Sequence, residues 1–372
     1  MGDFASIDGS HIATPALCID EEIFDSNIDS AIRVAGDPGR LWPHIKTYKS
    51  SRIVSRLQSR GIRSFKCATI AEADLLGRCG VRNALLAYPV TGPSIELLLD
   101  RCERYGRTSY SCLIEDDARL DSLSEQATVR AQTIGVFIDL DSGQGRTGIK
   151  EEKSIVDLAE RASGMTGIEF LGFHLYDGQN HQDEPELRRE AIREIWEWRN
   201  GIVDLLQQRG LTCETTIAGG TPTFPFFAEI ADCSLSPSTA FLHDAGYASH
   251  FPDLPFRPAA WVLGRIVSRH SDGAFTIDVG SKAIATDQNG PRGWFPDLID
   301  PELGEQSEEH WVLREPSAPD RQIGEIVRVV PTHICPTVNL YNEIIVLRRK
   351  SRIFESWPVD ARDRALRSNA TP

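Results

Sequence analysis

The sequence predicts an α/β protein in which a (β/α)8 TIM barrel is followed by a mostly β C-terminal domain. Two observations carry this prediction. Between about residues 39 and 240, eight short apolar runs alternate with longer amphipathic segments, which is typical of a parallel barrel. A doubly wound open sheet alternates in a similar way but uses fewer units. After about residue 250, β-rich segments separated by Gly, Pro and Asp loops take over, and none of them has a convincing helical period.

The predicted barrel strands are 40–46, 62–68, 82–88, 107–114, 134–140, 168–176, 212–218 and 232–236. In the segments between them, apolar residues recur three and four positions apart, and the longest such segment, 186–210, has acidic residues early and closes on glycine. We expect the barrel domain to span 21–248 and the β-rich domain to span 249–372. A lone predicted strand at 13–20 could join either domain, and we assign the segment 1–20 to the second.

Composition and charge exclude several classes of protein. Hydrophobic residues make up 41% of the 372-residue chain, so a packed core is expected and intrinsic disorder is not. The net charge of −14 repels phosphate backbones, so we expect no nucleic-acid partner. The first residues lack a signal-peptide pattern, and no apolar run reaches the length of about 18 residues that spans a membrane. The eight cysteines are scattered without a CxxC pair, which indicates reduced thiols and a cytoplasmic protein.

The first candidate for chemistry is Lys46, in the segment WPHIKTYKS (42–50). It closes the first predicted strand, at the carboxyl end of the barrel, where such folds hold their active sites. A lysine that loses its proton in a partly apolar pocket forms an imine with an aldehyde. Taken alone, Lys46 would be interpreted as a solvated loop lysine, but four further segments favour the catalytic interpretation.

A glycine-rich turn follows the fifth predicted strand. The segment DLDSGQGRTGI (139–149) presents Arg146 toward the barrel mouth. Its glycine spacing is not that of a dinucleotide fingerprint, and no helix begins within it. The alternative interpretation is a plain turn that carries an exposed arginine.

Two loops at neighbouring strand ends have the composition of a phosphate site. AGGTPTF (218–224) follows the seventh predicted strand and SPSTAF (236–241) follows the eighth. Barrels of this kind often bind phosphate at these two positions, through backbone N–H groups and hydroxyls. We therefore expect a phosphate cradle made by Gly219, Gly220, Thr221, Ser238 and Thr239.

The β-rich domain contains a candidate metal pair. In PTHICPTVNLY (331–341), His333 and Cys335 are two residues apart, so their side chains would face the same way on an extended strand. Imidazole and thiolate suit a borderline-soft ion such as zinc, and so few protein ligands leave positions for water or substrate. His310 is a candidate third ligand. The alternative is a buried cysteine beside a hydrogen-bonded histidine.

Taken together and in this order, the five segments resemble the fold-type III pyridoxal-phosphate enzymes, specifically the D-threonine aldolase and D-serine dehydratase family, relatives of alanine racemase. The resemblance covers nearly the whole chain. It implies that Lys46 holds pyridoxal 5′-phosphate as an imine, with His44 beside it. It also implies that Arg146 contacts the phenolic oxygen of the cofactor, and that Tyr176, in HLYDG, lies at the cofactor's edge. The loops described above would then hold the phosphate.

The resemblance also covers the metal pair and has informative departures. The HICPT segment is similar to the family's metal motif, which is His-x-Cys in dehydratases and usually His-x-Asp in aldolases. Trp42 and Tyr48 stand where the family usually has arginine and histidine, and Ser238 stands where it usually has glycine. These changes put the family's usual substrate in doubt rather than the fold or the cofactor.

The function implied by the resemblance is a lyase that acts on a D-configured β-hydroxy-α-amino acid, with pyridoxal phosphate and a divalent metal (Zn, Mn or Mg). In dehydration of D-serine or 3-hydroxyaspartate, Lys46 would remove the Cα proton, and the metal on His333 and Cys335 would activate the β-hydroxyl as leaving group. In retro-aldol cleavage to glycine and an aldehyde, His181 would collect the hydroxyl proton. Cys335 favours dehydration and the whole-chain pattern favours the aldolase, so both reactions stay open.

Two other classes stay open as well. An amino-acid racemase would need a second base opposite Lys46, and Tyr247 and Tyr341 are available but lie outside the racemase motif. A non-catalytic pyridoxal-phosphate-binding protein would lack the β-rich domain. The only partners that we expect are a small D-amino acid and, from the family's habit, a second copy in a homodimer, with no nucleic acid and no membrane.

Overall fold

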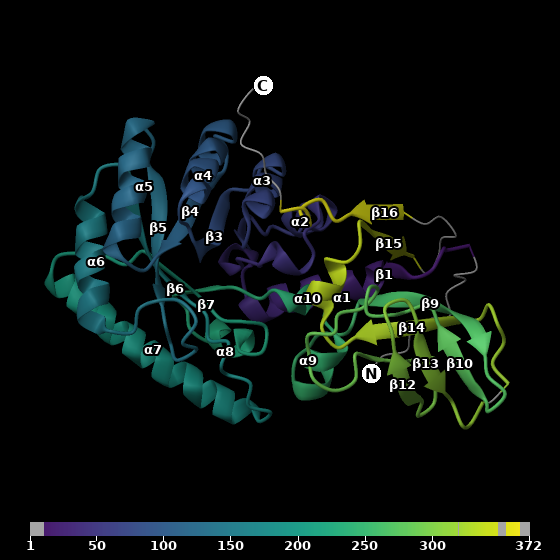
Figure 1. Cartoon of the computed structure of the whole chain (residues 1–372). Coiled ribbons are helices and arrows are strands. Elements are labelled where there is room, and N and C mark those ends of the chain that lie inside the picture. The colour runs from purple at the N-terminus through teal and green to yellow at the C-terminus, as the bar shows by residue number, and fades with distance from the viewer. Residues whose placement is uncertain (1–10, 319, 349–354, 365–372) are drawn as a thin grey trace, which may run out of the picture. The chain divides into compact units, whose positions relative to one another are not determined.

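The computed structural model describes residues 11–318, 320–348 and 355–364 of the chain. Its internal contacts divide the chain into two compact units, one built on a parallel sheet and one on a largely antiparallel sheet (Figure 1). The parallel unit is formed mainly by residues 32–46 and 53–238, and the β-rich unit mainly by 239–362 with an N-terminal segment. The domain bounds 21–248 and 249–372 stay predictions.

Seven parallel strands form a curled sheet in which neighbours in sequence are neighbours in space. They are β2 (Ser64–Cys67), β3 (Asn83–Pro89), β4 (Ser109–Ile114), β5 (Ile134–Leu140), β6 (Ile168–Leu175), β7 (Thr215–Ala218) and β8 (Cys233–Leu235). The helices between them are α3 (Ile70–Arg78), α4 (Pro93–Arg104), α5 (Asp117–Val129), α6 (Glu152–Gly164), α7 (Pro185–Gln208) and α8 (Phe224–Ala228). Because parallel strands all end at the same edge of the sheet, the loops that follow them share one face of the unit.

The first predicted barrel strand, 40–46, is not a regular strand. Isolated bridges at Leu41 and His44 connect it to β8 and β2, and it ends in the 3-10 turn η2 (Ile45–Thr47). Pro43 has no N–H group for a ladder, although its carbonyl accepts a backbone N–H from β2 at 3.0 Å. The segment thus joins the two edges of the curled sheet while remaining irregular, which corrects the prediction of a strand here.

Large apolar side chains fill the interior of the curled sheet. Leu85, Leu113, Phe137 and Ile217 come from four different strands and pack together, with the half-buried Trp42 against them. The Trp42 and Phe137 rings meet edge to face, with 6.3 Å between their centroids. The position that departs from the family pattern at residue 42 is therefore a packing position in this chain.

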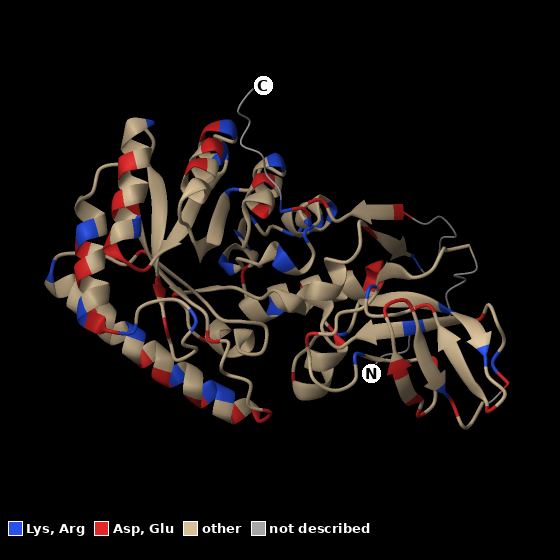
Figure 2. Ribbon diagram, in the orientation of Figure 1, with Lys and Arg blue, Asp and Glu red and all other residues tan. Residues whose placement is uncertain are grey.

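Helix α7 is the long amphipathic helix predicted at 186–210. Its buried face includes Ile192, Ile202 and Leu206, while Lys, Arg, Asp and Glu alternate along the rest of it (Figure 2). This is the pattern of a helix with one face on a core and the other in water. Within the described part of the chain, every helix is too short or too polar to cross a membrane.

In the β-rich unit, a nine-stranded sheet forms around the strand β1 (Ala16–Asp20). Strand β1 pairs antiparallel with β9 (Ala260–Arg269) and parallel with β15 (Glu343–Leu347), so it lies inside the sheet. Residues 1–10 of the predicted segment 1–20 lie outside the described residues. The other strands of this sheet are β10 (Ala274–Ile277), β11 (Gly293–Trp294), β12 (Glu302–Gln306), β13 (Trp311–Arg314), β14 (Ile326–Pro331) and β16 (Glu355–Pro358).

The remaining short elements are η1 (Pro38–Arg40), η3 (Thr239–Phe241) and the helices α1 (Glu21–Ala35), α2 (Ser51–Ser59), α9 (Ala245–His250) and α10 (Ile334–Val338). The last of these corrects a prediction. His333 precedes α10 and Cys335 lies within it, so the pair is not on an extended strand. Strand β14 ends at Pro331, and Pro336 lacks the N–H group that a continuing strand would donate, whereas a proline in the first turn of a helix costs no hydrogen bond.

Candidate active site

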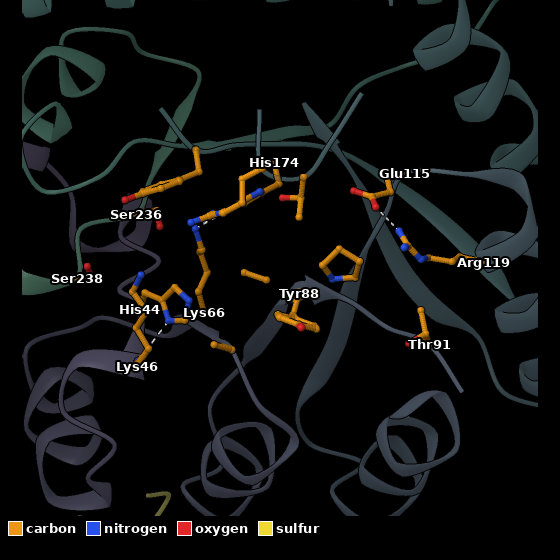
Figure 3. A pocket seen from close by; sticks show the side chains of 16 residues that line it. His44, Lys46, Lys66, Tyr88, Thr91, Glu115, Arg119, His174, Ser236 and Ser238 are labelled. Carbon is orange, nitrogen blue, oxygen red and sulfur yellow. Dashed lines mark hydrogen bonds and ion pairs between the residues drawn. The ribbon is translucent and has the colours of Figure 1, made fainter. Parts of the chain in front are cut away.

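A cavity of about 680 Å³ opens at the carboxyl ends of the parallel strands (Figure 3). All of its lining residues belong to the parallel unit. Four cationic side chains and two imidazoles face one carboxylate, so the cavity suits an anion although the chain as a whole is acidic. These ionisable residues are Lys46, Lys66, Arg119, Arg146, His44, His174 and Glu115.

Three residues predicted to hold the cofactor meet around one aromatic ring. The Lys46 Nζ atom lies 5.8 Å from the centroid of the Tyr176 ring, and the Arg146 guanidinium carbon lies 4.9 Å from it. Both distances are within the range of cation–π attraction. The backbone N–H of Lys46 also donates to His44 Nδ1 at 3.3 Å, so the predicted neighbour His44 helps to shape the turn that carries the lysine.

Carboxylates hold the loop that carries Arg146. Asp141 accepts hydrogen bonds from two glycine N–H groups of the loop, both at 3.0 Å. Glu115, at the end of β4, accepts from the N–H of Gly148 at 2.7 Å and also pairs with Arg119. Sequence reasoning did not find these anchors, because each joins the loop to a carboxylate whose position depends on the fold.

The cavity contains a buried chain of polar groups that sequence reasoning also missed. The Lys66 Nζ atom is 2.8 Å from His174 Nε2, and His174 Nδ1 is 2.7 Å from Asp139 Oδ1. Thr147 donates its hydroxyl to the second Asp139 oxygen at 2.7 Å. The only signal in the sequence was a lysine inside the apolar run 62–68, where a charged side chain needs a partner.

Burial and neighbouring charges set the protonation of this chain. Burial alone would raise the pKa of Asp139, but His174, Thr147 and Lys66 together hold it below its ordinary value. Burial and then repulsion from Lys66 lower the pKa of His174, despite the attraction of Asp139. Burial, followed by repulsion from Lys46, lowers the pKa of Lys66 from 10.5 to about 7. At neutral pH this hydrogen-bonded set therefore consists of an ionised Asp139, a neutral His174 and a Lys66 amine close to its pKa.

The predicted phosphate loops are only partly in the cavity. Ser238 lines it, and its N–H donates to the Thr221 hydroxyl at 3.2 Å, so the two loops are connected. Ser236, which the sequence did not single out, lines it too, and its buried hydroxyl has no hydrogen-bond partner among the residues that the structure describes. An unsatisfied hydroxyl facing a cationic cavity fits an oxygen-rich anion such as phosphate.

The other predicted phosphate residues are not among the side chains that line the cavity. Gly219 has φ +87°, and Gly220 donates its N–H to Thr223 at 3.3 Å. The Thr239 hydroxyl lies in the β-rich unit, 3.6 Å from the sulfur of Cys335. His181 is exposed on the loop after β6, and the structure does not bring it to the cavity.

The predicted metal pair lies within the β-rich unit. Burial alone would lower the pKa of His333, but contacts with Cys335 and Asp287 raise it to about 9. The His333 Nδ1 atom is 2.6 Å from Asp287, and the Cys335 sulfur is 3.1 Å from the Thr47 hydroxyl. Imidazole and sulfur thus remain neighbours, and this donor set fits a borderline-soft divalent ion. Among residues 11–318, 320–348 and 355–364, no group of three or more His, Cys, Asp or Glu could hold a metal, so His310 does not join the pair.

The curled parallel sheet, with a lysine and two serines lining a cationic cavity at its carboxyl edge, is the arrangement of pyridoxal-phosphate-dependent barrel enzymes. The family model "Alanine racemase, N-terminal domain" matches residues 19–235, and "Putative serine dehydratase domain" matches 259–347. The chain therefore belongs to the alanine racemase-like family, in its branch of D-threonine aldolases and D-serine dehydratases, which are pyridoxal-phosphate-dependent lyases. The predicted family, fold class and enzyme class are confirmed.

Individual relatives extend over almost the whole chain. The D-threonine aldolase of an Arthrobacter species is 30% identical over 364 residues, which are 95% of this chain and 93% of the relative. The 3-hydroxy-D-aspartate aldolase of Paracoccus denitrificans (strain Pd 1222) is 27% identical, covering 96% and 94%. The crystal structure of D-threonine aldolase from Filomicrobium marinum superposes with a TM-score of 0.88 at 28% identity, covering 95% and 96%.

Proposed function

We propose that this protein cleaves the Cα–Cβ bond of a D-configured β-hydroxy-α-amino acid, releasing an aldehyde and glycine. The cavity around Lys46 is the observation that carries the proposal. The full-length similarity to two aldolases that act on D-configured hydroxy-amino acids supports the bond and the configuration.

In this proposal the cavity residues hold the cofactor. Lys46 binds its aldehyde, Arg146 its phenolic oxygen, and Ser236 and Ser238 its phosphate, while Tyr176 contacts its ring. Once the substrate amine has replaced it, the Lys46 amine is free to return a proton at Cα. When bound, pyridoxal phosphate supplies an electron sink for the bond that breaks.

The metal and the proton acceptor are further parts of the proposal. His333 and Cys335 would hold a divalent ion, which supplies Lewis-acid activation of the β-hydroxyl. For His181 to accept the hydroxyl proton, as the sequence predicts, its loop after β6 would have to carry this exposed side chain to the cavity. A matched test compares His333→Ala and Cys335→Ser with the exposed His270→Ala, measuring zinc and manganese binding by calorimetry. We expect binding to weaken in the first two variants only, and unchanged binding in both would contradict the metal site.

Dehydration is the second candidate reaction, and the cysteine at position 335 favours it. D-threonine separates the two, since aldolase activity yields glycine and acetaldehyde, whereas dehydration yields a 2-oxo acid and ammonia. The assay includes manganese or zinc, with L-threonine as the control for configuration. Formation of neither set of products from D-threonine, D-serine or D-3-hydroxyaspartate would refute the lyase proposal for this substrate class.

The role of Lys46 has a direct test. Pyridoxal phosphate bound as an imine gives an absorbance band at longer wavelength than the free aldehyde, and borohydride fixes it to the protein covalently. We expect Lys46→Ala to lose the absorbance band and the covalent label. Its activity should fall by about 10²–10⁴-fold or more. Lys150→Ala, which removes an exposed lysine of the same unit, is the control and should keep all three.

We also propose that the protein is cytoplasmic and forms a homodimer. All eight cysteines lie in the described residues and are free thiols, which supports a reducing compartment. Light scattering of the purified protein tests the dimer, and a monomer at working concentrations would contradict it.

A further inference from the structure

Lys66 bridges two distant strands beneath the mouth of the cavity. It lies on β2 and reaches His174 on β6, four strands further along the curled sheet. Figure 3 shows its extended side chain running toward His174 between the other labelled residues of the cavity. Only 3% of Lys66 and 4% of His174 are exposed, so bulk water does not hydrate this amine in the way it hydrates a surface lysine.

The positions of the hydrogens on Asp139 and His174 leave Lys66 able to interact with a bound molecule. Because Asp139 is ionised and His174 is neutral, Nδ1 of His174 carries the hydrogen and donates it to Asp139. Nε2 is therefore an acceptor and takes one N–H from Lys66. Within the described part of the chain this amine has no other hydrogen bond, so its remaining valences are available to the cavity that Lys66 lines.

Matching polar groups by elimination points to one atom of the cofactor. Pyridoxal phosphate has four polar features: the aldehyde, the phosphate, the phenolic oxygen and the ring nitrogen. The proposed function assigns the first three to Lys46, the two serines and Arg146. Glu115 and Arg119 pair with each other, His44 accepts the backbone N–H of Lys46, and His174 bonds Asp139. This leaves Lys66 as the buried lysine of the cavity without an assigned cofactor atom.

We propose that Lys66, positioned by His174 and Asp139, hydrogen-bonds the ring nitrogen of the bound cofactor and shares one proton with it. This inference rests on the proposed function, in that Lys46 holds the aldehyde. The proton lies on the ring nitrogen or on Lys66, and no other reactant is needed. Its position controls how strongly the ring withdraws electrons from the bond that breaks, so Lys66 tunes the chemistry without touching the substrate.

Charged and titratable groups on every side of Lys66 determine whether its amine carries the shared proton. His174 and Asp139 face it from β6 and β5, Lys46 from η2, Arg146 from the loop after β5 and Asp177 from the end of β6. Burial and the two cations favour the neutral amine, whereas the two carboxylates favour the ammonium. The result is a lysine that can both donate to and accept from a pyridine nitrogen near neutral pH.

The test is a pH titration of the absorbance spectrum of the cofactor-loaded protein. We expect the wild type and Lys150→Gln to show a spectral transition across neutral pH, and Lys66→Gln to lose it. Lys66→Arg keeps a donor but cannot release its proton, so it should bind the cofactor without the transition. Asp139→Asn should shift the transition, because it changes which His174 nitrogen carries the hydrogen. Circular dichroism checks that each variant is folded.

The outcomes separate the two proposals. If the wild type takes up no pyridoxal phosphate, the proposed function itself fails. If the wild type loads and the transition persists unchanged in both Lys66 variants, only the role of Lys66 is wrong. Loss of the transition in Ser236→Ala, with both Lys66 variants titrating normally, would assign the ring nitrogen to the serine hydroxyl and overturn the inference.

Discussion

Single residues in the cavity carry positive charge on a chain whose net charge is −14. Lys46, Lys66 and Arg146 occupy one small volume, where they repel one another until an anion enters. A phosphate dianion relieves this repulsion, so binding the cofactor and stabilising the fold are coupled. The repulsion destabilises the fold most at the amine of Lys66, because this amine is buried away from water.

The destabilisation by the buried Lys66 ammonium should appear in the pH dependence of the free energy of unfolding. The pKa of Lys66 is about 7 in the folded protein, against 10.5 for a lysine surrounded by water, so the unfolded chain binds more protons between these values. The destabilisation by Lys66 is full below about pH 7 and vanishes as the pH rises toward 10.5. We expect the cofactor-free wild type to gain stability over this window, relative to Lys66→Met, by about 1.4 kcal/mol per pH unit.

Urea unfolding of the two proteins at several pH values measures this difference. Lys150→Met is the control, because the Lys150 ammonium is exposed to water in the folded protein as well as in the unfolded chain. A difference between the wild type and Lys66→Met that stays constant from neutral to alkaline pH would show that the folded pKa of Lys66 is ordinary.

At the scale of elements, the loop between β5 and α6 decides where Arg146 lies. Its backbone is closed by carboxylates on either side, and its last glycine, Gly148, has φ +98°. A Cβ atom there would come within 2.8 Å of the backbone nitrogen of Asp141. Gly145, in the same loop, has φ +65° and nothing within 4 Å of an added Cβ.

These two glycines form a matched pair for substitution. Gly148→Ala should destabilise the fold by about 1–3 kcal/mol and weaken cofactor binding, because the loop must move. Gly145→Ala should cost about 1 kcal/mol and leave binding nearly unchanged, since only the positive φ is strained. Urea unfolding and cofactor titration measure both effects. Equal behaviour of the two variants would mean that the loop adapts freely.

At the scale of the whole molecule, the N-terminal strand β1 completes a sheet made mostly by residues after 259. Ile19 pairs with Ala260 on one side and Val346 on the other, and its side chain is 0% exposed. The β-rich unit therefore cannot assemble its central strands until both ends of the chain are present. This long sequence separation makes the unit slow to form relative to helices of the other unit.

The central position of β1 predicts a large effect of a small change. Ile19→Ala should destabilise the protein by about 2–5 kcal/mol through the cavity it leaves. Val267→Ala, at a side chain of the same sheet that is 41% exposed, should cost less than about 1 kcal/mol. Denaturant unfolding followed by tryptophan fluorescence compares them, because Trp261 lies in the neighbouring strand β9. Similar losses for both would place β1 outside the cooperative core.

Local patterns were sufficient to predict the repeated strands and helices and to single out Lys46, which lines the cavity. The alternation from residue 39 to 240 and the period of α7 depend on neighbours within a few positions, so they are visible in the chain. The strand predicted at 40–46 failed because a proline and two long-range bridges decide its geometry. The strand predicted at His333 and Cys335 failed because β14 ends at Pro331, and Pro336 lies in the first turn of the helix α10 instead.

The sequence by itself determined the fold class, the family and the identity of Lys46 and Arg146 as cavity residues, because each rests on a local motif or a local period. Only the tertiary structure decided that Lys66, His174 and Asp139 meet. Their contacts join three strands, and Lys66 and His174 are 108 positions apart, so this set of hydrogen bonds leaves no periodic or local trace in the sequence. The burial that moves the Lys66 pKa is likewise a property of the folded cavity, since no single stretch of sequence excludes water from that amine.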